Sequence, residues 1–130
     1  MIYSLLVLSS PLSGNCSRHA ADFAHCVIAR GHSIHRVFFL DAGTVASAAT
    51  SVFPQDEANP LQSWVKLSEQ HAVELVICIS SALRYGMLNQ VEATRYERPG
   101  VTVHPAFTVS GLGQLVDACA HSDRLVTFGG

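Results

Sequence analysis

A short, continuous apolar segment, Leu75–Ile79, constrains the fold more than any other part of the sequence. It is rich in β-branched residues, is bounded by polar and small residues, and is too short for a typical buried helix. An uninterrupted apolar run of this length is typical of a strand buried on both faces, and such strands belong to parallel sheets covered by helices. We therefore expect Leu75–Ile79 to be a buried strand of a parallel sheet.

The rest of the chain alternates between strand-like and helix-like patterns. Apolar residues recur at helical spacing between Cys16 and Arg30, and Pro60 suits the first turn of a second helix. Further helix is expected from Ser80, and Ser110 is expected to cap a helix with an apolar face. The other expected extended segments are 2–8, 33–40, 101–104 and 124–128. The alternation predicts an α/β fold, a single-domain three-layer α/β/α arrangement with a mostly parallel sheet of about five strands.

Length and composition predict one domain over residues 1–130, of which 48% are hydrophobic. This apolar surplus is typical either of a surface partly covered by partner subunits or of a richly apolar parallel sheet. The net charge of −2 and the lack of a basic patch argue against direct nucleic-acid binding. No stretch is long enough to span a membrane, and the Met1–Leu8 segment lacks the positive residues of a signal peptide. We expect a cytoplasmic protein without a membrane contact.

Cys78 is the strongest candidate for chemistry among the four cysteines. It lies at the carboxyl end of the Leu75–Ile79 strand, where ligands and reactive groups gather in α/β sheets. A helix beginning near Ser80 would point its free N–H groups at the sulfur and lower the pKa of the thiol. Burial in the core is the competing interpretation. Ser80, Ser81 and Arg84 are candidates for stabilising the sulfur anion.

The other cysteines are expected to contribute to packing. Cys119 falls on the apolar stripe of the last long helix, and Cys26 is expected at the edge of the core. Cys16 is the main rival to Cys78, although its spacing from Ala20 favours burial. We expect reduced thiols without a structural disulfide.

The motifs of metal and cofactor sites are missing from the sequence. The cysteines form no Cys-x-x-Cys pair, and the histidines form no metal-binding pair, so no metal is expected. Nothing in the sequence places His104 near Cys78 as a dyad partner. The Ser9–Asn15 loop follows the first strand and could cradle a phosphate or flavin, but its single glycine matches no nucleotide-binding pattern. No cofactor is expected.

Three parts of the chain carry a resemblance to a known family. They are the Gly31-His32 pair with Arg36–Phe39, the Cys78–Gly86 block with Glu92-Ala93, and the Ser110–Ala118 block with Asp123–Phe128. In these segments the chain resembles the DsrE/TusD family of sulfur-relay proteins over essentially its whole length. The persulfide-carrying cysteine of that family falls on Cys78. The resemblance therefore implies a sulfurtransferase without a cofactor.

The resemblance also implies partners. Proteins of this kind sit with two homologous small subunits, of the TusB/TusC or DsrF/DsrH type, in a hexamer built as a dimer of heterotrimers. They accept sulfane sulfur from a TusA-like donor and pass it to a TusE/DsrC-like acceptor. In one branch the sulfur reaches the tRNA wobble uridine as 2-thiouridine, and this branch is the one we favour. The alternative branch serves dissimilatory sulfur oxidation.

Two interpretations from other classes stay open: a flavodoxin-like ligand-binding subunit, and a non-catalytic subunit whose partner holds the reactive thiol. Because both sulfur donor and acceptor would be proteins, we expect Cys78 in a mobile or exposed loop at the sheet edge, near a subunit boundary.

Overall fold

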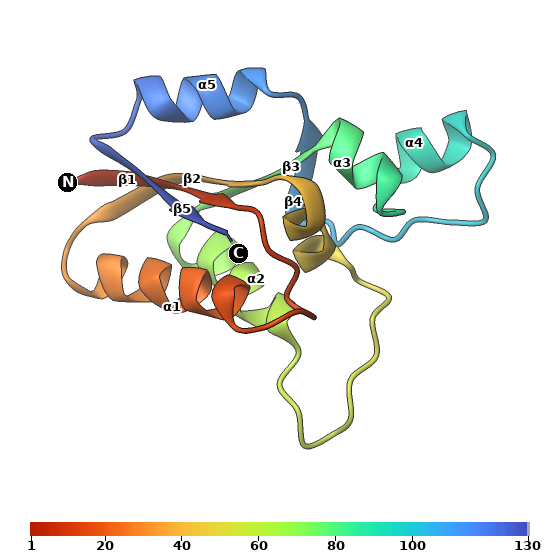
Figure 1. Ribbon diagram of the computed structural model, residues 1–130, viewed down its shortest axis with the longest axis horizontal. Helices are drawn as coiled ribbons and strands as arrows, with labels where there is room; N and C mark the ends of the chain where they lie inside the picture. Colours follow the sequence, from red (N-terminus) through yellow and green to blue (C-terminus); the bar gives the residue numbers. More distant parts are fainter. Residues whose placement is uncertain (130) are drawn as a thin grey trace.

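The computed structural model describes residues 1–129, which form alternating strands and helices (Figure 1). The elements in chain order are β1 (Ile2–Val7), α1 (Cys16–Ala29), β2 (Ser33–Phe39), the 3-10 helix η1 (Asp41–Ser47), α2 (Pro60–His71), β3 (Glu74–Cys78), α3 (Ile79–Arg84), α4 (Gln90–Arg95), β4 (Phe107–Ser110), α5 (Gly113–Ala120) and β5 (Arg124–Phe128). The predicted α/β class is confirmed.

The strands form one five-stranded sheet in the order β4-β3-β2-β1-β5, and all neighbouring pairs are parallel. The chain therefore moves outward from β1 to β4 and then returns to the other side of β1. Figure 1 shows α1 and α2 below the sheet and α5 above it. The three-layer α/β/α arrangement is confirmed. Parallel strands require crossover connections, which explains why helical structure follows each of β1, β2, β3 and β4.

The larger core lies between the sheet and the α1/α2 layer. Side chains alternate between the faces of a strand, so Val37 and Phe39 of β2 point to the same side as Leu75 and Ile77 of β3. The helices bring small and aromatic residues against them, and the Phe39 ring meets the Trp64 ring edge-on at 5.0 Å between centroids. This side of the sheet holds most of the buried apolar residues.

The opposite side of the sheet carries a much smaller core. The alternate positions of the same two strands, Phe38, Val76 and Cys78, are buried there, with Leu115 of α5 packed against them. Leu6 and Leu40 complete this cluster and are only partly buried. The strand pattern therefore places Cys78 under α5 and away from α1 and α2.

The orientation of α5 corrects a prediction. The sequence predicts an apolar face of Leu112, Leu115, Val116 and Cys119 for this helix, but Leu112 and Val116 are 55% and 69% exposed, and Cys119 is also exposed. Of the expected face only Leu115 turns inward; it does so together with Ala118, which is the buried residue of α5. Helical spacing alone did not predict this rotation, because apolar residues occur on more than one side of α5.

The fourth strand also differs from expectation. The predicted extended segment 101–104 contributes only an isolated bridge between Val103 and Ala48. The strand that joins the sheet is Phe107–Ser110, in register with Leu75–Cys78 of β3. Ser110 therefore ends a strand rather than capping α5, whose N-cap is Leu112 and has no side-chain cap hydrogen bond. A strand of four residues with one buried side chain is too short to show a recognisable pattern in the sequence.

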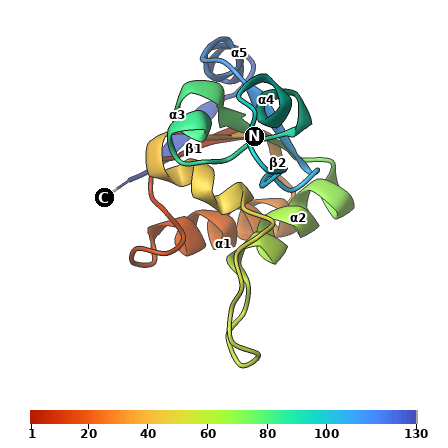
Figure 2. The ribbon, with the colours of Figure 1, turned by 90° about the vertical axis from the view of Figure 1, so that its right-hand side faces the viewer.

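The segment between β2 and α2 begins with η1, which lies beneath the ends of the strands. Gly43 is required there, because a Cβ at this position would overlap the carbonyl oxygen of Val7. The chain after η1 extends away from the body of the molecule before it returns to α2 (Figure 2). At Val52 in this extension, 94% of the residue surface is exposed.

Candidate functional site

Cys78 is the last residue of β3 and the residue immediately before α3, as the sequence predicted. It occupies the N-cap position with extended backbone angles, φ −68° and ψ 124°. The first N–H groups of a helix have no acceptor within it, and they carry partial positive charge. The cysteine therefore lies where the carboxyl end of a strand meets the start of a helix.

The Cys78 side chain is buried, which corrects the expectation of a mobile or exposed loop at the sheet edge. Only 2% of the residue is exposed, and β3 has a neighbouring strand on each side. Strand alternation directs the side chain into the small core with Phe38 and Val76, and Leu115 packs against this core from α5. A reaction partner therefore reaches the sulfur only after side chains on the α5 side move.

Two serines lie next to this position. Ser80 Oγ is 3.4 Å from Cys78 Sγ, and Ser80 is an exposed residue. Ser110 at the end of β4 pairs in register with Cys78. Sequence reasoning missed this neighbour of Cys78, because Ser110 was assigned to a helix cap.

The remaining predicted supporting residues are not brought to the sulfur. The buried Ser81 directs its Oγ to the backbone N–H of Asp41, at 3.0 Å, and joins α3 to η1. Arg84 is exposed in the last turn of α3, about 9 Å along the helix from Cys78 at about 1.5 Å per residue. Within residues 1–129, the Arg84 side chain has no hydrogen bond or ion pair.

The other three cysteines lie elsewhere and are free thiols. Cys16 is half-buried in the first turn of α1, and its thiol points to the carbonyl oxygen of Gly129 at 3.6 Å. Cys26 and Cys119 are exposed, so the expectation that they contribute to the core is wrong. Both occupy the outer sides of their helices. Cys78 is the buried cysteine of the chain.

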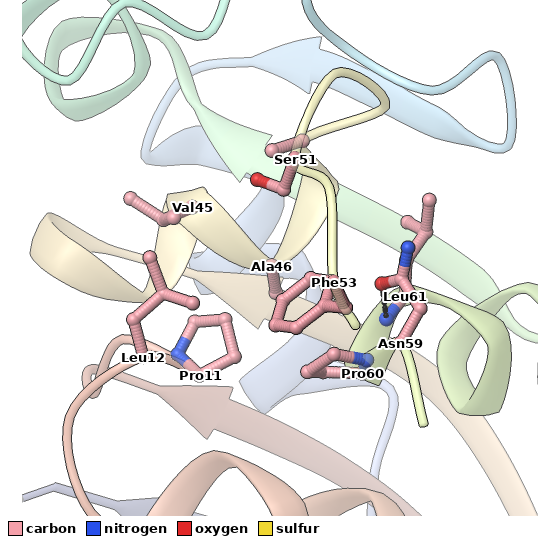
Figure 3. A pocket seen from close by; sticks show the side chains of 10 residues that line it. Pro11, Leu12, Val45, Ala46, Ser51, Phe53, Asn59, Pro60 and Leu61 are labelled. Carbon is pink, nitrogen blue, oxygen red and sulfur yellow. Dashed lines mark hydrogen bonds between the residues drawn. The ribbon is translucent and has the colours of Figure 1, made fainter. Parts of the chain in front are cut away.

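The Ser9–Asn15 loop does not form a cofactor pocket with Cys78. Pro11 and Leu12 of this loop face Val45, Phe53 and Pro60 across a small cavity (Figure 3). Its volume is about 10 Å³, enough for one water molecule at most. A larger groove runs between α1 and α2, lined in part by Arg18 and Lys66. It lies on the opposite side of the sheet from Cys78.

An ion-pair network joins β2, β3 and α5 at the amino-terminal end of the sheet. Arg36 is 6% exposed, and its Nη atoms donate to Asp117 at 2.7 Å, to Glu74 at 2.8 Å and to the backbone oxygen of Gln114 at 2.8 Å. The hydrogen bond from Arg36, aided by His35, holds the pKa of the Asp117 carboxyl below its usual value. This network fixes α5 on the sheet.

The fold and the site together define a class: a small parallel α/β protein with a buried cysteine at a strand-to-helix junction, suited to thiol-based transfer. The family model described as DsrE/DsrF-like matches residues 1–128. The chain belongs to this family.

Similar proteins support the same assignment. A sulfurtransferase TusD homolog of Pseudomonas aeruginosa is 41% identical, covering 96% of this chain and 95% of its own length. The TusD sulfurtransferase of Salmonella typhi is 36% identical over 98% of this chain and all of its own. A DsrE protein of Allochromatium vinosum is 37% identical over 99% of both chains. These names agree with the expected sulfurtransferase class.

Among solved structures, the YchN protein of Escherichia coli has a similar fold. Its TM-score is 0.79, with 14% sequence identity, over 98% of this chain and 99% of the other. This likeness concerns the fold alone. In the described part of the chain, no helix combines the length and apolar character needed to cross a bilayer.

Proposed function

We propose that this protein is a relay subunit that carries sulfane sulfur as a persulfide on Cys78. The observation that carries the proposal is the position of Cys78, at the end of β3 and directly before α3, in a chain whose relatives are named TusD sulfurtransferases. Ser80, whose hydroxyl lies 3.4 Å from the sulfur, assists the anion. Ser81 supports it indirectly by fixing α3, and Arg84 from the far end of that helix adds positive charge.

The reaction is two successive thiol–persulfide exchanges. The Cys78 thiolate attacks the outer sulfur of a donor persulfide; the new S–S bond forms at Cys78, and the donor leaves as a thiolate. The acceptor thiolate then attacks the outer sulfur of the Cys78 persulfide and restores the Cys78 thiolate. Sulfur and its attached proton move together, and no external oxidant or reductant is consumed. Such exchange needs an accessible nucleophile whose pKa lies near the ambient pH.

Because Cys78 is buried, the small core around it must open before the sulfur can react. Leu115 covers the small core that contains the sulfur, and α5 has only Ala118 fully buried. An arriving protein that displaces the Leu115 side chain would therefore expose Cys78, while the hydrogen bonds from Arg36 keep α5 on the sheet. A buried persulfide would meanwhile be shielded from water and from unrelated thiols.

The proposed donor is TusA-like and the proposed acceptor TusE/DsrC-like, with two homologous small subunits in a cytoplasmic hexamer. Exposed apolar residues on one side of the molecule support a covered surface. They include Leu112 and Val116 on α5 and Leu125 on β5, whose outer edge has no neighbouring strand. The final product is 2-thiouridine in tRNA, with the other subunits or the acceptor contacting the nucleic acid.

The persulfide step is tested by mass spectrometry of the intact protein after incubation with a persulfide donor. We expect added sulfur on the wild type and on a Cys119→Ser control, and none on Cys78→Ser. Labelling that survives in Cys78→Ser and disappears in Cys16→Ser would move the site to α1. No added sulfur on the wild type would remove the cysteine relay from this chain and favour the non-catalytic subunit.

The choice between tRNA thiolation and dissimilatory sulfur oxidation is tested separately in cells. Deletion of the gene is expected to lower 2-thiouridine in total tRNA, and a copy encoding Cys78→Ser is expected not to restore it. Normal 2-thiouridine combined with impaired oxidation of stored sulfur would assign the protein to the dissimilatory branch instead.

A further inference from the structure

We propose that His35, Asp117 and His121 form a binding site for a divalent cation of the zinc type. His35 lies near the start of β2, and the other two residues lie at the end of α5. Cys78 is at the opposite end of the sheet, since Arg36 pairs in register with Glu74, the first residue of β3. At about 3.3 Å per strand residue, the two places are about 15 Å apart. The site is thus separate from the sulfur chemistry.

The three side chains already present their donor atoms to one another. One donor atom from each residue lies within 4.8 Å of the others. His35 Nε2 is 3.4 Å from Asp117 Oδ2, and His121 Nδ1 is 3.0 Å from Asp117 Oδ1. Ligands of tetrahedral zinc at about 2.0–2.1 Å are separated from one another by about 3.3 Å. Small side-chain rotations therefore convert the hydrogen-bonded cluster into a ligand set.

The surroundings supply the support that metal ligands need. Arg36 donates to Asp117 Oδ2 at 2.7 Å and so orients this carboxylate, with Oδ2 also facing His35 and Oδ1 facing His121. Hydrogen bonds of this kind to a ligating carboxylate hold its geometry and influence metal affinity. Glu74 pairs with the same guanidinium at 2.8 Å. The arginine and the two carboxylates together leave one negative charge, which attracts a cation.

The helix itself adds to this attraction. His121 is the C-cap residue of α5, and its Nδ1 is 2.9 Å from the backbone oxygen of Asp117. Helix C-termini carry partial negative charge and stabilise cations. In the metal-free molecule this nitrogen donates to the carbonyl, so binding an ion replaces the proton on the imidazole, as metal binding generally does.

Access and donor type indicate which ion would bind. The His35 and His121 side chains are 31% and 64% exposed, so a hydrated ion reaches them and water completes the coordination. Imidazole nitrogens with one carboxylate suit zinc, nickel or copper, whereas magnesium and calcium prefer oxygen-only sites. A site of three protein ligands plus water is a familiar zinc arrangement.

The proposal is tested on the full-length, reduced and chelator-treated protein by calorimetric titration with Zn²⁺. We expect saturable binding tighter than about 1 mM, with affinity falling at least about tenfold in His35→Gln and in His121→Gln. The control is His19→Gln, an exposed histidine of α1 that is remote from the cluster. Its affinity should equal that of the wild type.

Two results would overturn the site. The first is the absence of saturable Zn²⁺ binding. The second is an equal Zn²⁺ affinity in the wild type and all variants, which would assign the ion to the cysteines. A second measurement on the wild type removes any dependence on variant folding: nitrogen NMR of the imidazole rings. Zinc should shift the ring nitrogens of His35 and His121, while those of His19 stay in place. Unchanged His35 and His121 signals at saturating zinc would also refute the proposal.

Discussion

Ser81 Oγ accepts a hydrogen bond from the backbone N–H of Asp41 at 3.0 Å, and this contact joins the first turn of α3 to η1. Asp41 has a left-handed backbone conformation, with φ of 51°. A non-glycine residue keeps this conformation when the surrounding structure holds it, so the direction of the Asp41 N–H is fixed by its neighbours. The start of α3, and with it the position of Cys78, is therefore fixed from a neighbouring element.

Replacing Ser81 is expected to destabilise the fold. Ser81→Ala leaves the Asp41 N–H without its acceptor, which should lower the free energy of unfolding by about 1–2 kcal/mol. Ser80→Ala is the matched control, because the Ser80 hydroxyl is on an exposed residue of the same turn. Its effect should stay within about 0.5 kcal/mol. Urea denaturation measures the free energy of unfolding of both variants. An equal loss in Ser81→Ala and Ser80→Ala would show that the hydrogen bond to Asp41 adds nothing to stability.

Leu115 is expected to control access to Cys78. Leu115→Ala removes part of the cover over the small core and should speed alkylation of Cys78 by iodoacetamide several-fold. Val116→Ala changes the adjacent, 69% exposed residue of α5 and should leave the rate unchanged. Peptide mass spectrometry follows each cysteine separately, with the exposed Cys119 as the fast internal reference. A Cys78 that reacts as fast as Cys119 in the wild type would contradict the closed site.

Gly43 is expected to tolerate no side chain. In Gly43→Ala the new Cβ meets the carbonyl oxygen of Val7, so η1 must shift away from β1, at about 2–3 kcal/mol. Gly111→Ala adds the same methyl group where no atom lies within 4 Å, and should change stability by less than about 0.5 kcal/mol. Thermal unfolding compares the two. Similar melting temperatures would refute the close approach of η1 to β1.

The Asp117 carboxylate should make stability depend on pH in the acid range. Its pKa is lowered in the folded protein by the hydrogen bond from Arg36, so the unfolded state takes up this proton first. The contribution is fully present above the ordinary carboxyl pKa of about 3.9 and is lost as pH falls through the lowered folded value. Asp117→Asn should flatten this part of the acid unfolding curve, whereas Asp22→Asn, in a 3.9 Å surface pair, should not.

The sequence predicted the elements whose patterns are long or uninterrupted. The Leu75–Ile79 run indicated β3 because burial on both faces leaves no polar alternation, and the spacing of Ala20, Ala24 and Val27 indicated α1. The strand Phe107–Ser110 was not predicted, because four residues with one buried side chain form no recognisable period. Its place in the sheet depends on pairing with β3, a contact between distant parts of the chain.

The sequence predicted where Cys78 lies in the fold but not its burial. Cys78 follows from the end of the apolar run, which is a local signal. Its burial depends on which side of α5 turns inward, and α5 has apolar residues on more than one side. The cluster of His35, Asp117 and His121 is equally invisible to local patterns, because β2 and α5 are separated by more than seventy residues, as the 82-residue interval between His35 and Asp117 shows.

The unequal cores on the two sides of the sheet have a mechanical consequence. The α1/α2 side contains most of the apolar contacts and should set the global unfolding temperature, whereas the α5 side contains the sulfur and few fully buried residues. Hydrogen exchange should therefore be faster in α5 than in the strands, through local openings that break the hydrogen bonds from Arg36. A molecule built this way can open its smaller core repeatedly while the larger core keeps the fold intact.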